Sequence, residues 1–108
     1  DHDHALAFET WTYASDTPMM FGLLQQVLTH LPETVFRAKG FIQAVEKPHR
    51  RLVFQLVGRR ATVAAGEPWG EEIPKTRLVF IARRGTVNIA AVQKALNGCK
   101  APGESKAV

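Results

Sequence analysis

The sequence predicts an α+β domain, with a four- to five-stranded, mainly antiparallel sheet and two or three helices in the order β-α-β-β-β-β-α. Short segments rich in β-branched and aromatic residues, several of them alternating with a period of two, predict the strands. Two segments with apolar residues three and four positions apart predict the helices. The predicted strands span residues 5–13, 35–45, 52–57, 61–65 and 78–82, and the predicted helices begin near residues 18 and 88.

The first strand and the first helix differ in their apolar period. Residues 5–13 alternate, so that Phe8 and Trp11 fall on opposite sides of an extended chain. The segment 15–18 combines a polar cap candidate with Pro18, which predicts that a helix begins there. The apolar residues that follow at helical spacing are Met20, Leu24, Val27, Leu28 and Leu31.

The three middle strands are predicted from alternation and from the turns between them. In residues 35–45, Arg37 and Lys39 share one side of the chain. Gly40 in the same strand predicts a bulge or a close approach of two backbones. Pro48 marks the next turn, and Gly58 turns the third strand into the fourth.

The last helix has a signal at each end. Asn88 is a candidate N-cap, and Gly98 is suited to the left-handed residue that ends many helices. Cys99 continues the apolar spacing of Val92 and Leu96, which predicts a small buried side chain rather than a ligand or a reactive thiol. Proline, glycine and small polar residues in 101–108 predict a flexible tail.

The third and fifth strands are apolar toward both sides, but two helices can cover only one face of the sheet. Apolar surface that stays in water loses the stabilising free energy of burial, about 25 cal/mol per Å². We therefore expect the second face to meet the loop of residues 66–75, another domain or a second copy of the chain.

Composition limits the class of protein. The chain of 108 residues is large enough for one core, its formal charge is +4, and its single cysteine excludes an internal disulfide. No segment reaches the roughly 20 apolar residues of a membrane span, so we expect a cytoplasmic protein without a membrane partner. The expected organisation is the end of a His/Asp-rich linker at 1–4, a folded domain at 5–100 and the tail at 101–108.

Four segments in succession resemble the C-terminal domain of the CobW-type family of P-loop GTPases. They are the strand with Phe8, Thr10 and Trp11 before the Pro18 helix; FRAKGF at 36–41; FQLVG at 54–58 with Trp69 beyond it; and RLVFI at 77–81, followed by a closing helix and Cys99. The resemblance covers residues 5–100. Ala82 departs from the glycine that the family usually has after its Val-Phe-Ile run.

The resemblance implies a parent protein that couples GTP hydrolysis to delivery of zinc or cobalt, or to cobalamin biosynthesis. It implies three partners for this chain: the N-terminal GTPase domain of the same protein, a client metalloprotein, and a second subunit. The phosphate-binding motif G-x-x-x-x-G-K-[ST] and the C-x-C and C-x-x-C metal motifs are absent from this sequence. We therefore expect no cofactor and no catalytic residue in this chain itself.

Three groups of residues are candidates for sites. His2 and His4, with Asp1 and Asp3, are candidate metal ligands or a solvated linker end. Arg37 and Lys39 either face a partner domain or pair with an acid such as Glu9 on a neighbouring strand. Trp11 and Trp69 lie either in the core or at an interface. His30 and His49 have no acid placed by the sequence to orient their rings.

The leading hypothesis is a non-catalytic accessory domain that acts by docking. The alternative is a small basic nucleic-acid-binding domain, suggested by the positive charge and by arginine pairs at 50–51, 59–60 and 83–84. A free-standing enzyme is disfavoured because no nucleophile and base, and no pair of carboxylates, stand out.

Overall fold

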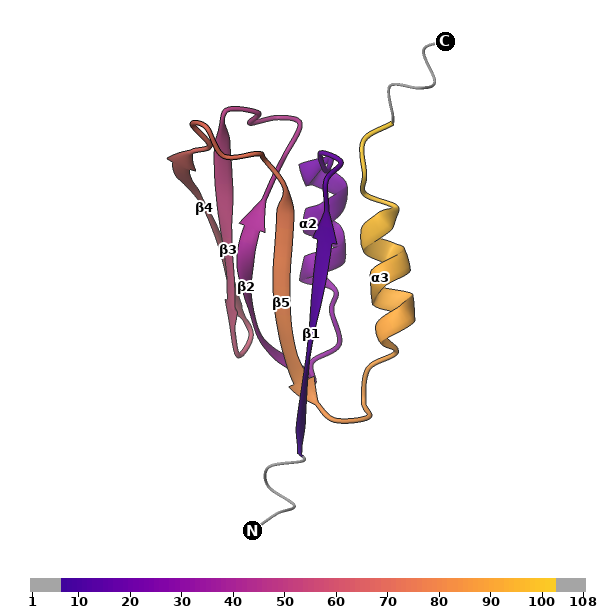
Figure 1. The fold of residues 1–108 in the computed structure, drawn as a ribbon. Coiled ribbons are helices and arrows are strands. Elements are labelled where there is room, and N and C mark those ends of the chain that lie inside the picture. The colour runs from indigo at the N-terminus through magenta and orange to yellow at the C-terminus, as the bar shows by residue number, and fades with distance from the viewer. Residues whose placement is uncertain (1–6, 103–108) are drawn as a thin grey trace.

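The computed structural model describes residues 7–102 and confirms the predicted class and element order. The strands are β1 (Phe8–Ser15), β2 (Val35–Ile42), β3 (Arg50–Val57), β4 (Arg60–Pro68) and β5 (Thr76–Arg83), and the helices are α2 (Phe21–Thr29) and α3 (Ile89–Asn97). The strands form one fully antiparallel sheet in the order β1-β5-β2-β3-β4 (Figure 1).

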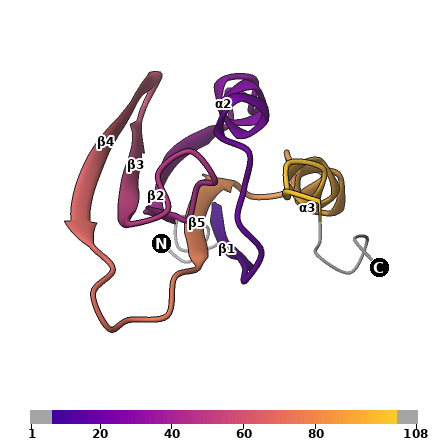
Figure 2. The same cartoon turned by 90° about the horizontal axis from the view of Figure 1, so that it is seen from above.

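Both helices lie on the same face of the sheet, and the view from above shows the opposite face without a helix (Figure 2). We call these the covered face and the open face. The core lies between the covered face and the helices, where Phe54, Phe80 and Leu78 from the strands pack with Leu24 and Leu96 from the helices. Tyr13 of β1 ties α3 to the sheet, because its hydroxyl donates to Asn97 Oδ1 at 2.9 Å.

The first helix begins later than its sequence signal, so the prediction of a start at residues 15–18 is wrong. Met19 and Met20 stay extended because their amides donate to Gln43 O and Cys99 O, at 2.8 and 2.7 Å. The helix starts at Phe21, whose amide donates to the carboxylate of Glu46 at 3.1 Å. A distant acid therefore satisfies the first turn of α2 in place of a local cap.

The prediction for the start of the last helix is confirmed, and the prediction of a left-handed glycine at its end is wrong. Asn88 is the N-cap, and its side chain accepts from Ala91 N at 3.0 Å. Gly98 is right-handed, with φ −67°, because the chain continues in a tight turn in which Cys99 N donates to Leu96 O. Cys99 itself is buried in the core, as its spacing predicts.

Gly40 makes the close backbone approach that its position in a strand predicts. Its φ is 156°, and a Cβ built there would lie 1.9 Å from the carbonyl oxygen of Arg77 on β5. Only glycine fits this position without moving one of the two strands. Within the described residues, no helix is long and apolar enough to span a membrane.

Candidate docking surface

The open face is built from alternate residues of all five strands, and strand register sets its rows. One row runs through Thr12, Val79, Lys39, Gln55 and Thr62. A second row runs through Thr10, Ile81, Arg37 and Val57. A third runs through Ala14, Arg77, Phe41, Val53 and Ala64. Each row joins small, apolar and basic side chains across the sheet.

Arg37, Lys39 and Arg77 place three positive charges in the middle of this face, and all three residues are exposed. None of them forms an ion pair with another residue between 7 and 102. Glu9, the acid that strand alternation offered as a partner, belongs to the other parity of β1 and accepts from Gly85 N at 3.0 Å. The middle of the open face therefore carries three positive charges that no carboxylate of the described residues pairs with.

Apolar side chains lie between these charges. Val53, Val79 and Ile81 are half-buried, while Phe41 and Val57 are 43% and 54% exposed. Phe8, also 54% exposed, packs against Phe36 with ring centroids 5.1 Å apart. The open face is thus neither fully polar nor sealed by the chain, which is the mixture found at non-obligate protein interfaces.

A hollow of about 300 Å³ lies at the centre of the open face. It is lined by Lys39, Gly40, Phe41, Val53 and Arg77, among others. Gly40 has no side chain, so it lines this hollow with backbone atoms alone. A smaller hollow of about 150 Å³ beside it is bordered by Arg37 and Ile81.

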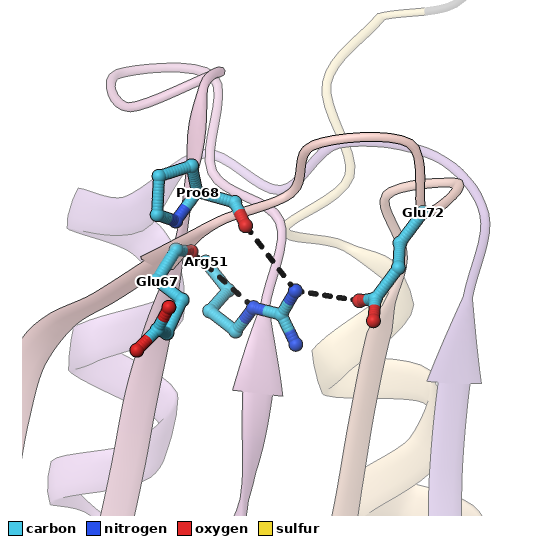
Figure 3. Close-up of polar contacts among 4 residues, drawn as sticks. All are labelled: Arg51, Glu67, Pro68 and Glu72. Atoms are coloured by element: carbon cyan, nitrogen blue, oxygen red, sulfur yellow. Dashed lines mark hydrogen bonds and ion pairs between the residues drawn. The ribbon is translucent and has the colours of Figure 1, made fainter.

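The loop of residues 69–75 covers one end of the open face, and Arg51 holds it there (Figure 3). The guanidinium donates to the carbonyl oxygens of Glu67 and Pro68, at 3.3 and 3.5 Å, and to the carboxylate of Glu72. It also stacks on Trp69, with its central carbon 4.7 Å from the ring centroid, and it lies 5.1 Å from the ring of Phe41. Such stacking adds to the ion pair because a planar cation meets an aromatic face.

The two tryptophans differ in their surroundings. Trp11 is buried on the covered face and stacks on Phe80 at 5.2 Å, so the docking surface that we describe does not include it. Trp69 is 6% exposed but lies outside the main core, beneath its own loop. The proposal that Trp69 contacts a partner stays a prediction.

The described residues do not fit a metal site. Between residues 7 and 102 there is no group of three or more His, Cys, Asp or Glu side chains that could hold a metal ion. Burial raises the pKa of the Cys99 thiol, which disfavours the thiolate that a metal would need. His2 and His4 lie outside the described residues, and their metal contact stays a prediction.

Comparison with known protein families finds one that matches nearly all of the described residues. Residues 8–100 match the family described as the cobalamin synthesis protein cobW C-terminal domain. The chain belongs to this family. A comparison with curated protein sequences finds no significant match.

Solved structures share the fold. The crystal structure of Zn(II)-bound YjiA GTPase from E. coli matches 93% of this chain at 23% identity, with a TM-score of 0.78. A Zn(II)-bound triple mutant of YjiA GTPase matches 88% of it, with the same identity and TM-score. The CobW C-terminal domain described here spans about a third of each of those chains, 32% and 30% respectively.

Proposed function

We propose that this chain is the non-catalytic accessory domain of a CobW-like GTPase, whose parent protein delivers zinc or cobalt to a client or acts in cobalamin biosynthesis. The domain docks through its open face on the GTPase domain of the same protein, on the client metalloprotein, or on both. Family membership supports this assignment, and so does the fold shared with a zinc-bound GTPase of about three times the length.

The observation that carries the proposal is the unbalanced charge of the open face. Arg37, Lys39 and Arg77 stand among half-buried aliphatic side chains, and none of the residues that face them on the neighbouring strands is an acid. A partner surface that brings carboxylates and apolar groups would neutralise the charges and remove the aliphatic surface from water. Hydrolysis of GTP in the parent would then change the strength of this docking.

The metal enters this proposal as cargo of the parent. With no ligand set between residues 7 and 102, this domain contributes contacts and leaves metal binding to other segments. The histidines at positions 2 and 4 are the segment of this chain that would meet the cargo.

The test is a binding measurement between the 108-residue chain and the GTPase domain of its parent. The double variant Arg37→Glu with Lys39→Glu should weaken binding at least about tenfold, because a charge reversal at an interface repels the partner's carboxylates. The matched control is Arg84→Glu with Lys94→Glu, which changes the net charge equally at exposed positions away from the open face. If both double variants bind like the wild type, the open face is not the docking surface.

One observation favours the alternative, a nucleic-acid-binding domain. Phe8 and Phe41 are exposed on a sheet face that also carries arginine and lysine, and sheets of this kind can stack bases on aromatic rings. Binding of a single-stranded oligonucleotide whose affinity falls steeply with salt would support this alternative. Absence of binding at about 50 mM salt would exclude it.

A further inference from the structure

The two edges of the sheet are not equally protected. At the β1 edge, the side chain of Gln93 on α3 donates to Thr12 O at 3.5 Å. At the other edge, β4 pairs only with β3 within the described chain, and its residues are exposed except for half-buried Gly66. An edge strand of nine residues with free backbone groups is a template for further pairing.

The hairpin turn decides which backbone groups of β4 are free. Val57 pairs with Arg60 across the two-residue turn Gly58–Arg59, in which Gly58 has φ 63°. The pair flanking such a turn exchanges both of its backbone hydrogen bonds, and the bonded pairs then alternate along the hairpin. The residues whose N–H and C=O groups point away from β3 are therefore Ala61, Val63 and Ala65.

The same three residues border an apolar groove on the covered face. The groove, of about 510 Å³, lies between β4 and α2 and is floored by Leu52 and Phe54. α2 and α3 leave it open, so Val63 is 38% exposed. The free edge and the groove are one continuous surface, with small side chains beside unpaired backbone groups.

We propose that β4 pairs with β4 of a second copy of this chain, antiparallel, about a two-fold axis at Val63. In this register Val63 faces Val63 of the second copy, and Ala61 faces Ala65. Every outward-pointing residue then meets an outward-pointing residue, and the groove-side methyl groups of the two copies come together. If the register shifted by one residue, backbone N–H and C=O groups that point away from β3 would face residues of the second copy whose groups point toward their own β3. The hydrogen bonds between the two copies would then be lost.

The charges along β4 favour the same partner. Arg60 stands at one end of the strand and Glu67 at the other. Antiparallel pairing with an identical strand brings the arginine end of each copy to the acidic end of the other. Parallel pairing would bring like charges together.

The strand also limits the contact. The β3–β4 register shifts between Arg50 and Leu52, so that Gly66 and Glu67 form a bulge opposite Arg51. Regular pairing along the free edge is thus confined to residues 61–65, and the contact buries less than the roughly 1,200 Å² of standard interfaces. The dimer is therefore weak and depends on protein concentration.

The first test is sedimentation of the 108-residue chain over a range of concentrations, with Val63→Pro as the variant. Proline removes an N–H that points away from β3, so the monomer should melt close to the wild-type temperature while the dissociation constant of the dimer rises at least about tenfold. The directional control is Ala64→Pro, which removes a bond to β3 and should lower the melting temperature.

The second test uses charge and does not depend on proline being tolerated. Arg60→Glu should weaken the dimer, and Arg60→Glu together with Glu67→Arg should restore it, because the swapped strand is again complementary to itself. A wild-type chain that stays monomeric throughout the concentration range overturns the proposal. So does a dimer that neither Val63→Pro in a folded chain nor the charge change weakens.

Discussion

Strand β5 shows how differently the two faces of the sheet are used. Its covered-face residues Thr76, Leu78, Phe80 and Ala82 are all buried, whereas its open-face residues Arg77, Val79, Ile81 and Arg83 range from half-buried to exposed. The covered face is specified by packing against α2 and α3. The open face keeps aliphatic residues that these helices do not cover and charges that the fold does not neutralise, so packing within the domain does not explain its composition, as expected of the docking surface that we propose.

The sharpest test of this contrast truncates neighbouring residues of β5 on opposite faces. Phe80→Ala should destabilise the domain by about 3–5 kcal/mol, because it opens a cavity beneath Trp11 in the core. Val79→Ala, on the open face, should cost about 1 kcal/mol or less. Equilibrium urea unfolding measures both free energies, and equal losses would contradict the division into two faces.

Gly40 tests the contact between the backbones of β2 and β5, which carries both faces of the sheet. Gly40→Ala should destabilise the domain by about 2 kcal/mol, because its Cβ cannot pass the Arg77 carbonyl oxygen without moving β5. The matched control is Gly22→Ala in α2, where a Cβ meets nothing within 4 Å and should stabilise by about 0.5–1 kcal/mol. Opposite signs of the two changes in melting temperature are the expected result.

Substitution of Arg51 tests whether its contacts hold the loop of residues 69–75 against the open face. Arg51→Lys keeps the charge but loses the planar stacking on Trp69 and the branched hydrogen bonding, at a cost of about 1 kcal/mol. Trp69 fluorescence, measured in a Trp11→Phe background, should shift to longer wavelength as the ring gains water. An unchanged spectrum would show that the loop is held by other contacts.

The smallest expected effect is on the covered face at alkaline pH. Burial raises the pKa of the Cys99 thiol above its ordinary value near 9, and burial likewise raises the pKa of Tyr13 above 10. The folded chain thus holds these protons to higher pH than the unfolded chain, and stability should fall as the pH rises above about 9. In Cys99→Ala the thiol contribution is absent, so the fall measured by urea unfolding between pH 8 and about 10 should be shallower.

Much of the fold could be predicted from the sequence because alternation and helical spacing are local signals. All five strands and both helices of the described chain match predicted segments, and the Asn88 cap is where its side chain suggests. The start of α2 could not be predicted, because Glu46, a residue 25 positions away, satisfies its first amide. The strand order was equally out of reach, since neighbouring strands β1 and β5 are far apart in the sequence.

The candidate surface was predictable only in part. Strand parity places Arg37 and Lys39 on one side, and the apolar excess of the third and fifth strands points to a second contact surface. Parity does not say which tryptophan lies in the core, and it does not reveal that Arg51 folds the loop back by stacking on Trp69. The β4 edge was not predicted. The two-residue turn at Gly58 determines which backbone groups of β4 point away from β3, but this matters only once the strand order shows that β4 is an edge strand.

The place of β5 between β1 and β2 has a consequence for how the chain reaches its native state. The β2-β3-β4 meander closes through short loops and can form early, whereas β1 has no neighbour until residues 76–83 have been synthesised. A ribosome-bound nascent chain that stops short of β5 therefore presents β1 without a partner strand and β2 with one unpaired edge. Insertion of β5 is the step at which we expect chaperone demand and the rate of folding to be decided.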